Sequence, residues 1–206
     1  MLFDILALIS ILIVILLLRR LINIFPSLMA CTIRWKESVN LEASIKHSLD
    51  RNMIAAAMFL PFCLTVEKFC LYSPRFMNDL TSGVHLTFII GIALLYCILR
   101  SIMSRMMRPQ KMDPKTYKTA VRVSFTFFII LTLVLLMMGG IMSFIDTDPV
   151  LIQNAMLCVS ICIYALFLIR KLQIFISCSS FFTAFLYLCA LEFFPTGVLV
   201  ASAIIF

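Results

Sequence analysis

The stretch VSFTFFIILTLVLLMMGGIMSFI, residues 123–145, contains 23 residues and no charged side chain. An α-helix rises about 1.5 Å per residue, so about 20 mostly apolar residues cross the hydrocarbon core of a bilayer. This stretch is long enough and apolar enough to do so. It therefore predicts a membrane-spanning helix.

The rest of the chain has the same character. Of its 206 residues, 63% are apolar and 13% are charged, and the mean hydropathy is +1.11. A soluble domain has about 45–50% apolar and about 25% charged residues. There is too little polar surface here to cover a globule in water. The composition excludes a soluble enzyme, a disulfide scaffold and a disordered tail, and it makes the lipid bilayer the solvent.

Five further segments have the length of a span. We expect one all-α domain over residues 1–206, a polytopic transmembrane helical bundle of about six spans. The spans are predicted at residues 2–18, 53–72, 83–103, 123–145, 150–169 and 172–203, the last with a break near residues 192–197. Asp113-Pro114 and Asp148-Pro149 place a capping acid before a proline, so they should start the fourth and fifth helices.

Two segments do not fit simple spans. The apolar residues 172–206 would measure about 52 Å as a straight helix, against a hydrocarbon core of about 30 Å. We expect this segment to lie partly along the interface, to tilt strongly, or to fold back after residue 195. Residues 38–51 have an amphipathic pattern, which predicts a short helix on the cytoplasmic surface or a solvated cap on the second span.

The positions of the cations predict the orientation. With the N-terminus outside, 15 of the 17 Lys and Arg residues fall on cytoplasmic segments, and only Lys68 and Arg75 fall outside. Positive residues concentrate on the cytoplasmic side of membrane proteins. We therefore expect a multi-pass protein of the inner (cytoplasmic) membrane with both termini periplasmic. No basic stretch precedes the first apolar run, so this run should remain as a span.

Glu192 and Pro195 form the leading candidate site. An ionisable residue at membrane depth is costly unless it is paired or faces a cavity. Pro195 lacks an N–H, and its ring presses on the carbonyl of Leu191. An acid beside a freed carbonyl is typical of transporter sites, although Glu192 could equally cap the outer end of the last helix. We expect Glu192 to be buried among helices, with a donor from Tyr187, Ser180, His85, Lys68 or the backbone near Pro195.

The remaining candidates are weaker. Glu67 and Lys68 are adjacent on a helix, so they do not face each other and should reach the outer interface. His85, near the outer end of the third span, could partner either acid. The eight cysteines and two histidines show no metal spacing, and no catalytic or nucleotide-binding motif occurs. The sequence predicts no cofactor, no metal and no nucleic-acid partner, and it disfavours catalysis.

The run YLCALEFFP, residues 187–195, resembles the closing signature of a family of bacterial, Bacteroidetes-type, multi-span integral membrane proteins of unknown function. That signature reads close to YLCTLEILP. Residues 44–72, with Ser48-Leu49-Asp50-Arg51-Asn52 before the second span, are also similar. The chain departs from the pattern in lacking the usual basic residue after the last helix. The resemblance implies an inner-membrane location and marks Glu192 and Pro195 as signature residues, but it implies no activity.

Three classes of function follow. The first is a non-catalytic membrane component that binds a partner protein in the cell envelope, favoured by the absence of catalytic motifs. The second is a small proton- or ion-linked transporter or channel built around Glu192. The third is a membrane-embedded enzyme acting on lipid, which would need another acid, histidine or metal ligand at the depth of Glu192.

Overall fold

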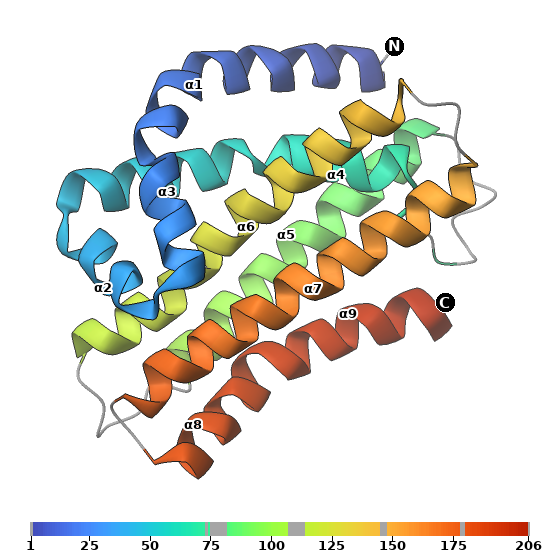
Figure 1. Ribbon diagram of the computed structural model, residues 1–206. Helices are drawn as coiled ribbons and strands as arrows, with labels where there is room; N and C mark the ends of the chain where they lie inside the picture. Colours follow the sequence, from blue (N-terminus) through green and yellow to red (C-terminus); the bar gives the residue numbers. More distant parts are fainter. Residues whose placement is uncertain are drawn as a thin grey trace.

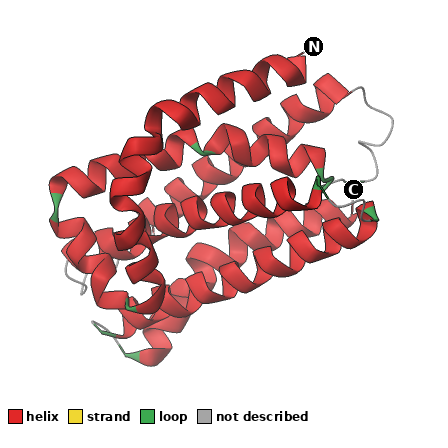
Figure 2. Cartoon of the chain, turned by 45° about the horizontal axis from the view of Figure 1, so that its top comes forward, coloured by secondary structure: helices red, strands yellow, loops and turns green. Residues whose placement is uncertain are grey.

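A computed structural model describes residues 2–72, 74, 82–106, 114–144, 148–177 and 180–205. These residues are helical almost throughout, and none of them lies in a strand (Figures 1 and 2). The helices are α1 (Leu2–Ile33), α2 (Trp35–Ala43), α3 (Ile45–Ala57), α4 (Phe59–Lys68), α5 (Ser82–Met106), α6 (Pro114–Met142), α7 (Pro149–Ile176), α8 (Phe181–Leu188), a π-helix (Cys189–Phe193) and α9 (Phe194–Ile205).

Six helical segments in the described residues are long and apolar enough to cross a membrane. The second of them combines α3 and α4, and the sixth combines α8, the π-helix and α9. The predicted all-α bundle with six candidate spans is therefore confirmed. The segments are Phe3–Ile33, Lys46–Lys68, Gly83–Met106, Thr116–Met142, Pro149–Ile176 and Phe181–Ala203.

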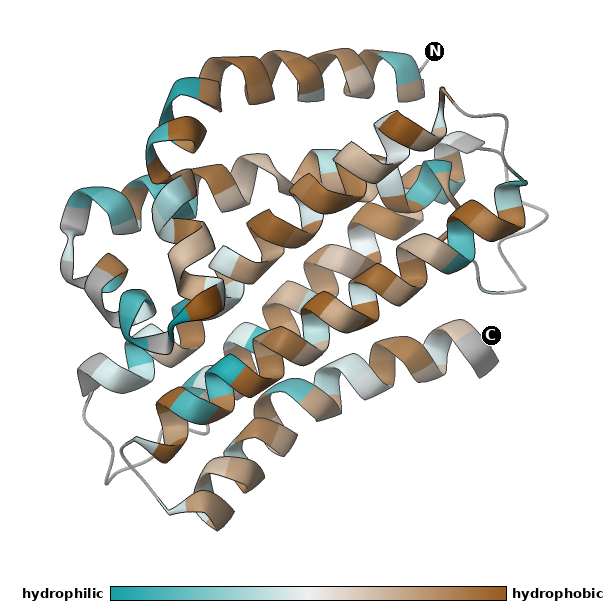
Figure 3. Cartoon of the chain, viewed as in Figure 1, coloured by the Kyte–Doolittle hydropathy of each residue, from teal (hydrophilic) through white to brown (hydrophobic). Residues whose placement is uncertain are grey.

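Both termini lie at one end of the bundle, as an even number of spans requires, and α2 lies at the other end, called here the α2 end (Figure 1). Apolar residues run along most of every long helix, whereas hydrophilic residues gather around α2 and the adjoining parts of α1 and α3 (Figure 3). This distribution suits helices whose outer surfaces face lipid. It places most of the exposed polarity at the α2 end.

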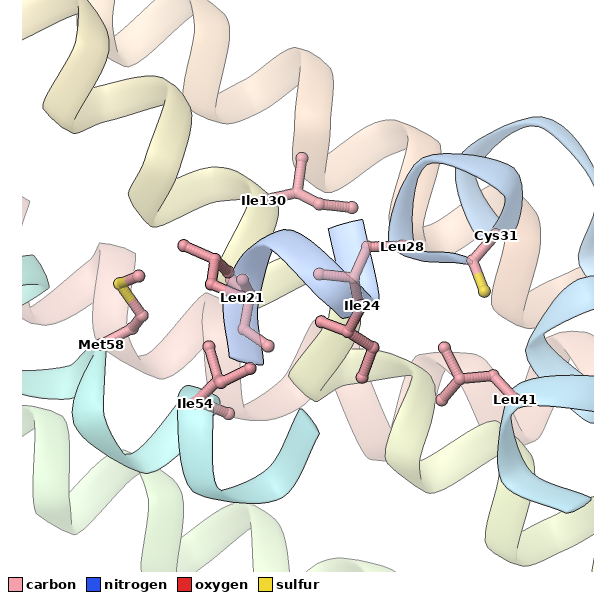
Figure 4. Close-up of a cluster of buried hydrophobic side chains, with 10 residues drawn as sticks. Leu21, Ile24, Leu28, Cys31, Leu41, Ile54, Met58 and Ile130 are labelled. Carbon is pink, nitrogen blue, oxygen red and sulfur yellow. The ribbon is translucent and has the colours of Figure 1, made fainter. Parts of the chain in front are cut away.

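The first helix is longer than predicted, and it bends. It continues past residue 18 to Ile33 and changes direction along its length (Figure 1). Pro26 lies inside it, lacks an N–H and presses on the carbonyl of Ile22, which kinks a helix. Beyond the bend, apolar side chains at helical spacing are buried against α2, α3 and α6 (Figure 4). These α1 residues are Leu21, Ile24, Leu28 and Cys31.

The amphipathic surface helix over residues 38–51 is a wrong prediction. The segment is divided at Ser44, which has extended backbone between α2 and α3. Leu41 is buried, but so is most of Arg51, whereas Leu49 is exposed. The charged face points into the protein because Glu42 meets cations from two other helices there.

The predicted helix starts at Pro114 and Pro149 are confirmed, but the capping hydrogen bond expected from Asp148 is not formed. α6 begins at Pro114 and α7 at Pro149. Asp148 stands at the N-cap of α7, but its side chain makes no capping hydrogen bond. Asp113 lies outside the described residues.

The boundary between the last two spans differs from the prediction. α7 continues to Ile176, so the sixth span begins at Phe181 and has 23 residues, which a bilayer accommodates without a fold-back. The expected break appears as the π-helix, after which α9 continues in the same span. Arg170 and Lys171 consequently lie within α7 and not in a loop.

Gly139 and Gly140 provide a matched test of the packing of α6. A Cβ at Gly139 would lie 2.9 Å from Cε2 of Phe69, whereas a Cβ at Gly140 would meet nothing within 4 Å. Alanine raises helix propensity equally at both positions, so the clash alone separates them. We expect Gly139→Ala to be less stable than Gly140→Ala by about 1–3 kcal/mol, measured by denaturant unfolding in micelles. Equal stabilities would show that the Phe69 ring moves aside freely.

Candidate functional site

Glu192 lies within the π-helix, about half-way along the sixth span, and it is fully buried. About 16 Å of helix separates it from Phe181 at the start of that span. The predicted burial of Glu192 is confirmed. Its alternative position, as a cap at the outer end of the last helix, is wrong because the span begins nine residues later than expected.

The π-helix has a local cause in Pro195. A proline at this position cannot donate a backbone hydrogen bond, and its ring would collide with the carbonyl one turn earlier. The chain widens here, and the N–H of Phe194 donates to the carbonyl of Cys189, five residues back. Such single π-turns occur frequently at functional sites. Pro195 itself is buried.

Two cations from two other spans bind the same oxygen of Glu192. Arg100 of α5 donates from Nη2 to Oε1 over 2.5 Å, and Lys171 of α7 donates from Nζ to the same Oε1. The Lys171 side chain is 2% exposed and that of Arg100 is 23% exposed. Oε2 of Glu192 is buried and has no hydrogen-bond partner among the described residues. Three spans therefore meet at one carboxylate.

The directions of α5 and α7 explain how these cations reach Glu192. Arg100 lies six residues before the end of α5, and Lys171 lies five residues before the end of α7. Side chains tilt toward the N-terminus of their own helix. Both helices end at the α2 end, so both side chains point back toward the middle of the bundle. The ring of Phe167 lies 5.6 Å from the Arg100 guanidinium and 5.7 Å from Lys171 Nζ, within cation–π range.

Hydroxyl groups extend the polar contact along the same three helices. Thr196 follows Glu192 by one turn, and its Oγ1 accepts a 3.0 Å hydrogen bond from the hydroxyl of Tyr164. Tyr96, one turn before Arg100, shares a 3.3 Å hydrogen bond with Thr196. We call this group the Glu192 cluster: Tyr96, Arg100, Tyr164, Lys171, Glu192 and Thr196.

A second acid near the α2 end is held in a similar way. Oε2 of Glu42 accepts a 2.9 Å bond from Nη2 of Arg51, and Oε1 accepts one from Nη1 of Arg122. Ser48 is 3.4 Å from Oε2 and 3.1 Å from Nη1 of Arg122. These four residues form the Glu42 cluster, which joins α2, α3 and α6. Each cluster thus contains one carboxylate and two cations.

A model of one protein family, described as "Domain of unknown function (DUF4271)", matches residues 5–202. The chain belongs to the DUF4271 family. No curated protein and no solved structure matches it. The matched residues include every member of both clusters and the run 187–195 that carried the resemblance. This DUF4271 protein is accordingly a member of a family of unknown function with six candidate membrane-spanning helices.

The donors predicted for Glu192 in the DUF4271 chain are wrong. Tyr187 packs against Phe175, with ring centroids 6.4 Å apart, and Ser180 shares a hydrogen bond with Thr183. His85 is half-buried near the start of α5, about 22 Å from Arg100 along the helix axis. Glu67 lies near the end of α4, beside Lys68, which stacks over Phe69 at 5.6 Å. The structure does not bring the four predicted side-chain donors, Tyr187, Ser180, His85 and Lys68, to Glu192.

Sequence reasoning missed both cations that bind Glu192 in the DUF4271 protein. Arg170-Lys171 follows an apolar run and was therefore assigned to a cytoplasmic loop. In the structure, Arg170 donates from Nε to the carbonyl of Thr32 at the end of α1, over 2.9 Å. The spacing of polar residues could have indicated the cluster. Tyr96 and Arg100 are four residues apart and share a helix face, and the same is true of Glu192 and Thr196.

The chemistry that the Glu192 cluster can perform is limited by its charge. Its three charged side chains are one carboxylate and two cations, whose formal charges sum to +1. Within the described residues, no three His, Cys, Asp or Glu side chains gather where they could hold a metal ion. The cluster is arranged to hold α5, α7 and the last span together.

Proposed function

We propose that this DUF4271 protein is a non-catalytic membrane component that binds a partner protein, and that a transmembrane helix of the partner docks between α1, α4 and α6. The observation that carries this proposal is a groove of about 290 Å³ between these helices. Small residues line it: Ala7, Ser10, Thr65, Gly139, Gly140 and Ser143. Small residues let helix backbones approach closely in a membrane, where packing drives association.

Two residues of the groove, Gly140 and Ser10, are suited to contact a docked helix. Gly140 is exposed, and an added Cβ there would meet no atom within 4 Å, whereas Gly139 is covered by Phe69. Ser10 is only 5% exposed and lines the groove, where its hydroxyl group can bond to a docked helix. A helix that carries small or hydroxyl side chains would pack on Gly140 and bond to Ser10.

The ionic clusters support a structural role for the charged residues of the spans. Glu192 is shared by two cations from different helices, and so is Glu42. Such an acid joins the spans that supply its cations. A rigid bundle of this kind suits a component that presents a fixed surface to another protein.

Blocking the groove tests the proposal. We expect Gly140→Leu to fold, because nothing lies near its Cβ, and to lose the partner that copurifies from native membranes after photocrosslinking at position 143. Gly91→Leu is the matched control, since a Cβ at Gly91 on α5 also meets no atom within 4 Å. It should retain the crosslinked partner. Equal crosslinking in both variants would place the partner elsewhere, and no crosslink in the wild type would contradict partner binding itself.

We further propose that the membrane is the inner membrane of a bacterium and that both termini are periplasmic, supported by the concentration of cations in the segments predicted to be cytoplasmic. A second candidate function, a proton- or ion-linked transporter, is favoured by one observation. Glu192 lies within a π-helix, and its Oε2 is buried without a hydrogen-bond partner among the described residues. Replacement of Glu192 separates the two functions, as argued in the Discussion.

A further inference from the structure

The Glu42 cluster contains more positive charge than its acid neutralises. Arg51 is 2% exposed and Arg122 is 29% exposed, and both pair with the single carboxylate of Glu42. Both carboxylate oxygens are already used, one by each arginine. A buried excess cation is costly unless an anion compensates for it. The formal charge of the cluster is therefore +1, which one further anion would neutralise.

An unused hydroxyl group lies on the same face of α2. Ser38 is one turn before Glu42, so the two side chains share a helix face. Ser38 is 4% exposed, and its Oγ is buried without a hydrogen-bond partner among the described residues. A buried hydroxyl is expected to donate or accept a bond. Because Ser38 shares a helix face with Glu42, which binds both arginines, an anionic oxygen is a suitable partner for it.

Arg51 also donates from Nε and Nη2 to Oδ1 of Asn52, whereas Arg122 has more donors left. A guanidinium carries five N–H groups, and the hydrogen bonds of Arg122 to described residues all use Nη1. Its Nε and Nη2 are free to bind an anion with two parallel bonds, the arrangement by which arginine recognises phosphate. The chemistry of two arginines and a serine hydroxyl therefore fits a phosphate group.

The depth of the cluster indicates the source of that phosphate. Arg122 lies eight residues from the start of α6, about 12 Å, and its side chain tilts back toward the α2 end. Arg51 lies six residues from the start of α3, about 9 Å. Both arginines lie close to the α2-end limits of their candidate spans, Lys46–Lys68 and Thr116–Met142, where a lipid headgroup is nearer than at mid-span. The Glu192 cluster has the same net charge, but it lies half-way along its span, beyond the reach of headgroups.

We infer that the Glu42 cluster binds the phosphate of an anionic lipid headgroup through Arg51, Arg122 and Ser38. Glu42 positions the two guanidinium groups, and the lipid phosphate supplies the charge that the protein lacks. Exposed Arg34 and Lys46 lie on the chain on either side of α2, where they strengthen the attraction to an anionic leaflet.

Lipid retention measures this binding. The protein is purified in micelles containing equal amounts of phosphatidylglycerol and phosphatidylcholine, and the retained lipid is identified by native mass spectrometry. We expect the wild type to retain one phosphatidylglycerol in preference to phosphatidylcholine. Ser38→Ala should lower that preference about tenfold, and Arg122→Gln should abolish it. Both variants should fold, because Ser38 makes no bond in the lipid-free protein and Arg122→Gln leaves Glu42 paired with Arg51.

Ser160→Ala is the matched control, because Ser160 is a half-buried serine on α7 whose Oγ donates to the carbonyl of Met156 in its own helix, outside the Glu42 cluster. It should retain phosphatidylglycerol as the wild type does. Wild-type retention in Ser38→Ala and Arg122→Gln would overturn the inference. So would stabilisation of the wild type by inorganic phosphate without any preference for phosphatidylglycerol, since the ligand would then be free phosphate.

Discussion

Glu192→Gln is expected to destabilise the folded protein by about 3–5 kcal/mol, the cost of leaving buried charges without a partner. Glutamine keeps the shape of the side chain but cannot neutralise Arg100 and Lys171, which both bind Oε1. Denaturant unfolding in micelles, followed by circular dichroism, measures the loss. Lys171→Met should cost less, because it leaves a neutral pair between Glu192 and Arg100.

A rescue experiment separates a structural cluster from a transport site. Replacing a buried ionic group entirely by apolar side chains is often neutral for stability. The triple variant Arg100→Met, Lys171→Met, Glu192→Leu should therefore recover the stability that Glu192→Gln loses, and it should still bind the partner. If Glu192→Gln instead folds normally and the protein loses an ion or proton flux in proteoliposomes, the transporter is the correct function.

Glu42→Gln should have the second-largest effect, about 3 kcal/mol of lost stability. It leaves Arg51 buried beside Arg122 with no carboxylate. The loss should be smaller than for Glu192 because Arg122, at 29% exposure, can turn toward water. Thermal unfolding in neutral detergent measures it without compensation from anionic lipid.

Asp50→Asn provides the control for Glu42→Gln. Asp50 pairs with Arg20 over 3.2 Å, but the Arg20 side chain is largely exposed. Exposed ion pairs contribute about 0–1 kcal/mol, so this variant should be nearly as stable as the wild type. If the two variants lose the same stability, the Glu42 cluster is no more than a surface network.

The span count and the helical class could be predicted because both depend on residues that are neighbours in the chain. Residues 123–145 are apolar without interruption, and the prolines at 114 and 149 mark helix starts. The burial of Glu192 was predictable for the same reason, since apolar residues surround it on its own helix.

The boundary between the fifth and sixth spans could not be predicted from hydropathy. Residues 150–206 are apolar almost throughout, and Arg170-Lys171 is the most polar point between the two spans. That dipeptide was therefore taken as the loop. Its real role depends on two groups distant in sequence: the carbonyl of Thr32 holds Arg170, and the carboxylate of Glu192 holds Lys171.

The sequence by itself determined that this protein is helical and that it has the composition of a multi-pass membrane protein, in agreement with the six candidate spans among the described residues. Hydropathy and helical spacing depend on residues that are adjacent in the chain. They do not change with the way the rest of the chain folds. Only the tertiary structure decided which charges are inside. The free energy of a buried charge depends on the groups that surround it, and here those groups come from three different helices. Neither the pairing of Glu192 with Arg100 and Lys171 nor that of Glu42 with Arg51 and Arg122 exists until the bundle is assembled.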